Sequence, residues 1–325
     1  MRCQLRAQIN IRDNYKTNKS ICNEKCEWLT KNFSNIDLEI PLTDIYTNSI
    51  KNLYFNIQNV RDYINIEAEI DLEENRITKE DLQFFKTREV MEQTYKRILC
   101  DEFEIRINDI FLALQISQPG RFDFLKIRLF VDNIEKETSY YNKILTSAIT
   151  ENIRIYSNKT IKTVEFNKVW KWLTEQKDFW NEVPDDKVGI FLNYFRYFNY
   201  DKSPLAIIWI SMALESILVT NEKFSKSQLN GKLKIILDRY YTDDEVDKNV
   251  NYFYKFRSKI VHGKQRLFRP TILHDALDSV AKIDEELSKS GEFGYIAMIL
   301  CLHLMIEKNS NDLKFNEKII YTLID

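Results

Sequence analysis

The stretch LAIIWISMALESILVT, residues 205–220, decides the fold of the second half of this chain. It carries one charged side chain, Glu215, and is apolar on almost every side of a helix. A helix that is hydrophobic nearly all round must be buried on all sides, so it belongs at the centre of a bundle. We therefore predict that residues 166–325 form an all-helical domain built around this stretch.

Apolar residues at helical spacing flank the central stretch on both sides. Helices are predicted over residues 187–200, 225–241, 242–263, 271–289 and 295–306. The helix over 242–263 begins with acids and ends with bases, as the helix dipole favours, and Gly263 suits the position just beyond its end. A helix rich in tryptophan, over 167–181, opens the domain, and we expect Trp170, Trp172 and Trp180 to pack between the two domains.

The first 165 residues contain both the alternating pattern of strands and the apolar spacing of helices, and therefore predict an α+β domain. Residues 63–72 and 125–131 alternate apolar and polar side chains, which indicates half-buried strands. A helix is predicted over 78–99 with Thr78 as its N-cap, and two short strands over 153–166. This domain shows no constellation of catalytic residues that would predict an activity of its own.

Composition limits the classes of function that the chain can have. The formal net charge of −2 argues against a generally basic coat for nucleic acid, so any polyanion site must be local. Cys22 and Cys26 could form half of a metal clamp, but no second cysteine or histidine pair has ligand spacing. Reduced thiols are the simpler interpretation of the five cysteines. We expect no metal and no cofactor.

Neither end of the chain predicts membrane insertion. The first residues lack the apolar core of a signal peptide. The longest apolar run, residues 295–306, is shorter than the roughly 20 residues that cross a bilayer, and predicts a buried helix. We therefore expect a cytoplasmic protein.

The most informative residues lie in RSKIVHG, residues 257–263. Arg257 and His262 are separated by four residues, and the chain has only three histidines. The other two, His274 near a helix start and His303 in an apolar run, are expected to be structural. Six bases, with no acid between them, occupy this part of the chain: Lys255, Arg257, Lys259, Lys264, Arg266 and Arg269.

Two interpretations of Arg257 and His262 are open at this point. Five residues turn an ideal helix through about 500°, so the two side chains start about 140° apart. They can converge within one chain only if His262 lies in a frayed last turn and the arginine reaches forward. Otherwise His262 ends the helix, and the bases compensate its dipole and form a solvated face.

The combination of these features resembles the HEPN superfamily of helical domains, and its Apea-like branch in particular. The features are the spacing in RSKIVH, the aromatic YFYKF before it (residues 252–256), Gly263 after it, and ISMALESIL (210–218) with Glu215 upstream. The resemblance covers roughly residues 185 to 290. Catalytic members often carry Asn, Asp or His after the arginine, where this chain has Ser258.

The resemblance implies a metal-independent endoribonuclease that acts as a homodimer. Attack by an RNA 2′-OH on the adjacent phosphate needs proton transfer, which a histidine can supply, and charge stabilisation, which an arginine can supply. His262 and Arg257 would take these roles. Glu215 would pair with Arg257 or a neighbouring base, either to orient it or only to stabilise the bundle. The flanking bases would contact the RNA backbone.

Further expectations rest on the same resemblance. Many such nucleases are toxins of prokaryotic defence against phage, and the first domain would then bind a trigger or hold the nuclease in check. The dimer would close through the helical domain, and we expect the apolar faces of VNYFYKF and GIFLNYF to form the contact. A rival from another class is an inactive scaffold that dimerises or binds a nucleotide or partner protein. A DNA nuclease in the first half lacks a convincing carboxylate–lysine motif.

Overall fold

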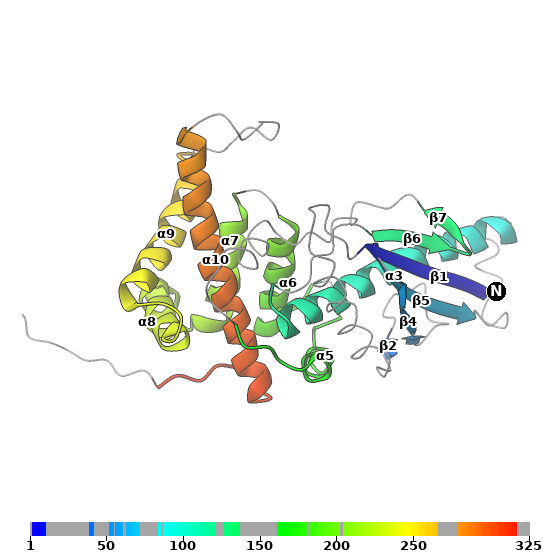
Figure 1. Cartoon of the computed structure of the whole chain (residues 1–325), viewed down its shortest axis with the longest axis horizontal. Coiled ribbons are helices and arrows are strands. Elements are labelled where there is room, and N and C mark those ends of the chain that lie inside the picture. The colour runs from blue at the N-terminus through cyan, green and yellow to red at the C-terminus, as the bar shows by residue number, and fades with distance from the viewer. Residues whose placement is uncertain are drawn as a thin grey trace, which may run out of the picture. The chain divides into compact units, whose positions relative to one another are not determined.

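The computed structural model shows two compact units (Figure 1). One contains Met1–Arg154 and Lys162–Trp170, and the other contains Ile155–Ile161 and Lys171–Asp325. The residues described are 2–10, 39–41, 52–54, 56–60, 63–71, 84–85, 87–120, 127–136, 161–180, 183–201, 204–265 and 278–316. The fold is thus α+β followed by helices.

An antiparallel sheet forms the described core of the first unit, in the strand order β4-β5-β1-β6-β7. Its central strand β1 (Arg2–Asn10) pairs with β5 (Tyr63–Asp71) on one side and β6 (Ile127–Val131) on the other. Cys3, Leu5 and Ala7 alternate into the core along β1. The predicted strands over 63–72 and 125–131 are therefore confirmed. The remaining strands are β4 (Asn56–Val60) and β7 (Ile134–Lys136) in this sheet, and β2 (Glu39–Pro41) paired with β3 (Asn52–Tyr54).

Helix α3 (Arg88–Ser117) contacts β1 and β6 and differs from its prediction at both ends. It begins at Arg88, where the Thr87 side chain accepts a hydrogen bond from the N–H of Val90 at 3.3 Å. Thr78, the expected N-cap, lies outside the described residues. The helix also continues far beyond residue 99, because residues 103–117 are largely buried and tertiary packing sustains them.

The two short strands expected over 153–166 are not observed where the structure describes that range. Residues 161–165 form neither helix nor strand. They are tied instead to the end of α3, since the Ser117 hydroxyl donates to the carbonyl of Val164 at 2.6 Å and the Val164 N–H donates back at 3.0 Å. An alternating pattern here reflects an extended segment packed on a helix end rather than on a neighbouring strand.

The second unit is helical, and its elements follow the predicted order. Helix α5 (Phe166–Thr174) begins in the first unit and ends in the second. It is followed by α6 (Lys187–Tyr200), α7 (Ala206–Leu218), the short 3-10 helix η3 (Glu222–Phe224), α8 (Ser225–Leu237), α9 (Asp243–Val261) and α10 (Asp278–Glu307). Residues 295–306 are the second half of α10 rather than a separate helix.

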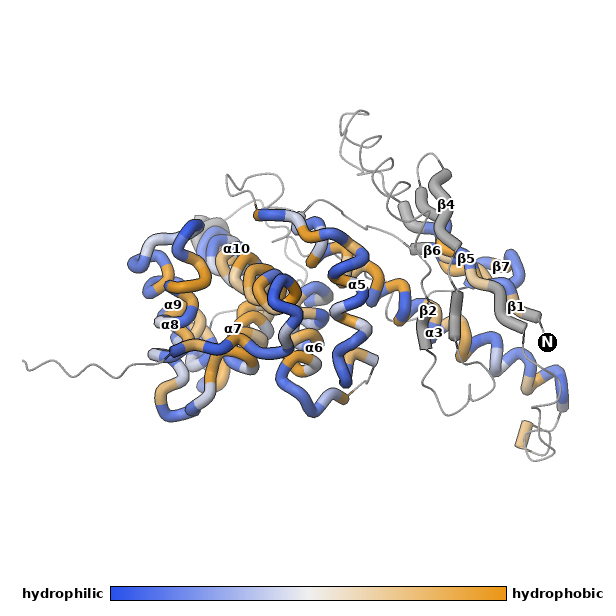
Figure 2. Tube along the Cα trace, turned by 90° about the horizontal axis from the view of Figure 1, so that it is seen from below, coloured by the Kyte–Doolittle hydropathy of each residue, from blue (hydrophilic) through white to orange (hydrophobic). Residues whose placement is uncertain are grey.

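Helix α7 is the centre of this unit, as its composition predicted. It contacts α6, α8, α9 and α10. Eight of its residues are buried: Ala206, Ile207, Ile210, Ser211, Ala213, Leu214, Ile217 and Leu218. Figure 2 shows hydrophobic colour along α7 and α10, where the core of the bundle lies.

Gly294 lets α10 approach α7 closely. A Cβ atom on Gly294 would lie 2.3 Å from Cγ2 of Ile210, which is itself fully buried. The surrounding α10 stretch Glu285–Glu307 is, among the described residues, the one helix long and apolar enough to cross a membrane. It is 78% buried inside the protein, as expected of a helix that forms one wall of this core.

We predict opposite effects of the same substitution at two helical glycines. Gly294→Ala should lower the free energy of unfolding, because overpacking a core costs about 1–3 kcal/mol. Gly231→Ala, whose new Cβ would meet nothing within 4 Å, should raise it by up to about 1 kcal/mol through helix propensity. Urea denaturation measures both changes. Equal stabilisation by the two variants would show that α7 and α10 are not in close contact.

Candidate functional site

Helix α9 is defined sharply at both ends. At its start, the Thr242 hydroxyl accepts from the N–H of Glu245 while the Glu245 carboxylate accepts from the N–H of Thr242 at 2.8 Å, a complete capping box. At its end, Gly263 has φ +64° and donates to the carbonyl of Ile260 at 3.0 Å, and Lys264 donates to that of Lys259 at 2.7 Å. This is a Schellman motif, with Gly263 in the position expected from the sequence.

Arg257 of α9 forms an ion pair with Glu215 of α7. Its Nη1 lies 3.0 Å from Oε1 and 2.9 Å from Oε2 of the carboxylate. The side chains are 42% and 20% exposed respectively, so the pair sits at the rim of the core. The expected pairing of Glu215 is therefore confirmed, and its partner is Arg257. Because the contact uses only Nη1, Nη2 and Nε of the arginine have no partner among the described residues.

Two further side chains, which the sequence did not single out, surround this ion pair. The buried Ser211 hydroxyl donates to Oε1 of Glu215 at 3.3 Å from one helical turn earlier. Tyr254, three residues before Arg257, places its buried hydroxyl beside Glu215 and Ser225. Burial raises the pKa of Tyr254 to about 12, a rise that Ser225 reduces and Glu215 increases. The spacings of four and three residues from the motif could have indicated both residues.

His262 lies just beyond the last helical residue and is exposed. Its N–H donates to the carbonyl of Ser258 at 3.1 Å, so the last turn is closed and not frayed. The regular helix keeps the starting directions of Arg257 and His262 about 140° apart. Arg257 reaches to Glu215 instead, so the convergence within one chain that the sequence left open is not observed.

Between these two side chains lies a narrow exposed strip at the end of α9. Taking Arg257 as the origin, Val261 lies at about 40°, Ser258 at about 100° and His262 at about 140° around the helix. Ser258 and His262 are exposed, and Val261 is 73% exposed although it is apolar. We call these four residues the α9 strip. It places an arginine at one edge and an imidazole at the other.

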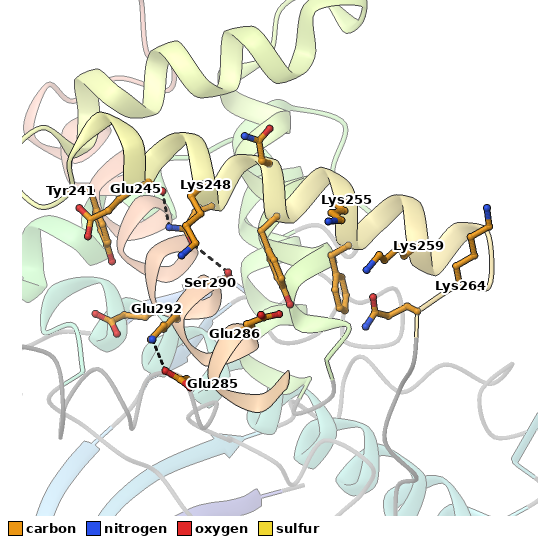
Figure 3. A pocket seen from close by; sticks show the side chains of 16 residues that line it. Tyr241, Glu245, Lys248, Lys255, Lys259, Lys264, Glu285, Glu286, Ser290 and Glu292 are labelled. Atoms are coloured by element: carbon orange, nitrogen blue, oxygen red, sulfur yellow. Dashed lines mark hydrogen bonds and ion pairs between the residues drawn. The ribbon is translucent and has the colours of Figure 1, made fainter. Parts of the chain in front are cut away.

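The lysines predicted to bind RNA lie on the adjacent side of α9, along a groove that α10 completes. Figure 3 shows Lys255, Lys259 and Lys264 at one end of this groove. The groove has a volume of about 970 Å³. None of the three ammonium groups has an ion-pair partner within the described part of the chain. Arg266 and Arg269, and also His274, lie outside the described residues. His303 is buried in α10, as expected of a structural residue.

The cysteines offer no metal site where the structure describes them. Cys3, Cys100 and Cys301 are free and buried, and burial raises the pKa of Cys3 to about 11 and that of Cys100 to about 12. Cys22 and Cys26 lie outside the described residues. In the described ranges, no three His, Cys, Asp or Glu side chains are grouped to hold a metal ion.

Comparison of the chain with protein-family models, with curated proteins and with solved structures finds no match.

We predict that Glu215 and Arg257 are energetically coupled. Glu215→Ala and Arg257→Ala should each lower the free energy of unfolding, and the double variant should lose less than the sum. The coupling should be about 0.5–1 kcal/mol, because both groups are partly exposed, and should shrink at high salt. Guanidinium unfolding is unsuitable because it screens charge, so urea is the denaturant of choice. Strictly additive losses would mean that the pair does not form in solution.

Proposed function

We propose that this chain is a metal-independent endoribonuclease of the HEPN type, which cleaves RNA by attack of a 2′-OH on the adjacent phosphate. The observation that carries the proposal is the Glu215–Arg257 pair. It holds a guanidinium at the rim of the core, on the strip that ends at His262. This constellation belongs to the two segments on which the resemblance to HEPN proteins rests.

The geometry of Arg257 suits binding of a phosphate. Glu215 occupies Nη1 and fixes the direction of the side chain, while Nη2 and Nε are not engaged by any described residue. These two nitrogens form the planar fork with which arginine binds phosphate oxygens in bidentate fashion. A guanidinium held from behind in this way can stabilise the charge that develops on the phosphate without first reorganising.

His262 supplies the proton transfer. An imidazole can accept or donate a proton at neutral pH, so it can take the proton of the 2′-OH or protonate the departing 5′-oxygen. Its exposed position just beyond the helix leaves it accessible to RNA. Because the nucleophile is part of the substrate, the reaction needs only these proton transfers and charge stabilisation. One copy of the motif supplies one histidine, whereas acid and base together call for two.

A second copy would complete the site. The apolar faces of VNYFYKF and GIFLNYF do not serve as the contact, because Phe253, Phe256, Phe191 and Phe195 are buried inside their own bundle. The exposed alternative is the α9 strip. If two copies pack their strips together across a two-fold axis, Val261 is buried and each Arg257 comes towards the other copy's His262. The angle of about 140° that separates Arg257 from His262 in one chain then lets each of them meet its counterpart on the other copy.

A second candidate function is an inactive scaffold. The observation in its favour is that Glu215 already neutralises Arg257, as it would in a purely structural ion pair. Ser258 in place of Asn, Asp or His also favours it slightly. The scaffold would dimerise, or bind a nucleotide or a partner protein, without hydrolysing RNA. Activity of the purified protein separates the two candidates.

The wider role that we propose follows the resemblance alone. The protein would be a cytoplasmic toxin of prokaryotic defence against phage, in which the first unit senses a trigger or restrains the nuclease. The chemistry proposed for the second unit does not depend on this role.

The first prediction of this proposal concerns the reaction. The full chain should cleave RNA in EDTA and leave 2′,3′-cyclic phosphate ends. His262→Ala should slow cleavage by about 10²- to 10⁴-fold, because it removes a general acid–base group. Arg257→Lys should also slow it, since an ammonium keeps the charge but loses the fork. Labelled-RNA gels and end-group analysis measure these effects.

Lys308→Ala, an exposed change beyond α10, is the matched control and should cleave at the parent rate. Fragments with 3′-hydroxyl ends would rule out the mechanism. Full activity of His262→Ala would remove that residue from the site, and a purified parent protein without any cleavage would favour the scaffold.

The second prediction concerns the dimer. Val261→Asp should convert a dimer into a monomer and abolish cleavage, because a charge would be buried at the contact. Ile235→Asp, an equally exposed apolar position on α8 outside the strip, should keep both properties. Light scattering at micromolar concentration gives the mass of each variant. Dissociation by the Ile235 change alone would place the contact on α8 instead.

A further inference from the structure

The groove between α9 and α10 carries a row of lysines at one end. Lys255, Lys259 and Lys264 line that end, where α9 finishes, whereas Glu245, Lys248 and Glu292 give the other end a mixed charge (Figure 3). Between the two ends, aromatic rings from α9 form part of the wall. A row of lysines beside an aromatic surface is unlike the lining of a core cavity.

Compensation of the helix dipole does not account for the lysine row. The dipole acts over the last turn of a helix, and within α9 only Lys259 belongs to that turn. Lys255 lies a turn earlier and Lys264 lies beyond the last residue of the helix, yet both line the same groove. Lys255 and Lys259 are one helical turn apart, about 6 Å along the axis, which is comparable to the step between neighbouring phosphates of an extended strand.

Tyr252 provides an aromatic surface beside this row. Its ring stacks on Phe256 with a centroid distance of 5.8 Å and an interplanar angle of 24°. Phe256 is only 3% exposed and anchors the pair in the core, whereas Tyr252 is half-buried and lines the groove. Burial, and then the charge of Glu286, raise the pKa of the Tyr252 hydroxyl to about 12, so the ring stays neutral. A neutral ring held from behind is a suitable platform for a stacked base.

The acids of α10 set the orientation of any anionic ligand. Glu285 is paired with Lys289 at 2.5 Å, so its charge is largely compensated, but Glu286 stands opposite the aromatic wall. Phosphates would be repelled from the α10 side and attracted to the α9 side. A strand in the groove would therefore lie with its backbone along the lysines of α9 and its bases turned into the groove, where the Tyr252 ring lies.

The groove also borders the α9 strip. Around the helix, Lys255 lies at about 160° and Lys259 at about 200° from Arg257, directly after His262 at about 140°. A single strand can turn its bases inward onto an aromatic platform, whereas a duplex hides its bases from it. The lysine row, the aromatic surface and the position beside the α9 strip thus all favour a single strand of nucleic acid as the ligand of the groove.

We propose that the α9–α10 groove binds single-stranded RNA beside the site of cleavage, with phosphates on Lys255, Lys259 and Lys264 and a base stacked on Tyr252. This inference rests on the proposed function for its choice of RNA, but binding in the groove is separable from cleavage. It assigns a binding surface, the lysine row with the Tyr252 ring, that lies outside the Arg257 and His262 motif.

The test is binding of fluorescent RNA to the full chain carrying His262→Ala, in EDTA, so that cleavage does not remove the probe. Single-stranded RNA of mixed sequence should bind, and the same RNA annealed to its complement should compete at least tenfold less well. Changing both Lys255 and Lys259 to Ala should weaken binding by tenfold or more. It should also reduce the slope of log affinity against log salt by about 0.7 per lysine.

Tyr252→Ala should weaken binding by roughly 5- to 150-fold, which corresponds to the loss of one stacked base, while Tyr252→Phe should bind like the parent. Lys308→Ala is the charge-matched control, since about 24 Å of helix separates it from Glu292, and it should bind normally. The lysine changes are on exposed side chains, so they test the groove even if the Tyr252→Ala protein is unstable.

The outcomes separate this inference from the proposed function. Cleavage by the parent, together with normal binding by the Lys255 and Lys259 variant, would overturn the groove and leave the nuclease. Groove-dependent binding without cleavage by the parent would support the groove and overturn the nuclease. Equal competition by duplex RNA would overturn the assignment of a single strand.

Discussion

The structure of the second unit depends on the burial of α7 against the helices around it. A helix that exposes no polar face must be covered on every side, and α6, α8, α9 and α10 provide that cover. The position of α7 in the core also determines what surrounds Glu215, the single charged residue on this helix. A carboxylate at the rim of an apolar core needs a partner, and Arg257 of α9 supplies it. The packing of α9 on α7 and the position of the candidate catalytic arginine therefore depend on the same ion pair.

Helix α9 carries three different faces. Val250, Phe253 and Phe256 pack into the bundle, the α9 strip faces outward, and the lysine row lines the groove with α10. The capping box and the Schellman motif fix the length of the helix, so its faces keep a constant relation to one another. One regular helix can thus hold an arginine, an imidazole and a row of lysines in a fixed angular order.

The first unit is built from a sheet and a long helix rather than from a bundle of helices. Its sheet is held by alternation along β1, where Cys3, Leu5 and Ala7 face the core. Helix α3 is buried on nearly all sides in its second half, where local pattern is a poor guide to the limits of a helix. The strand expected over residues 161–165 is not observed for this reason. Propensity and alternation act locally, whereas the end of α3 is set by contacts with segments remote in sequence.

The sequence by itself determined the helical nature of the second unit, the centrality of α7, the limits of α9 and the need of Glu215 for a basic partner. Each depends on periodicity, capping chemistry or the cost of an unpaired charge, all of which are local or compositional. Only the tertiary structure decided that Arg257 and His262 leave α9 in different directions. It alone placed Ser211 and Tyr254 around the ion pair, and buried the phenylalanine faces that had been expected to form a dimer. These features depend on how helices pack against one another, and a single sequence does not specify which neighbour covers which face.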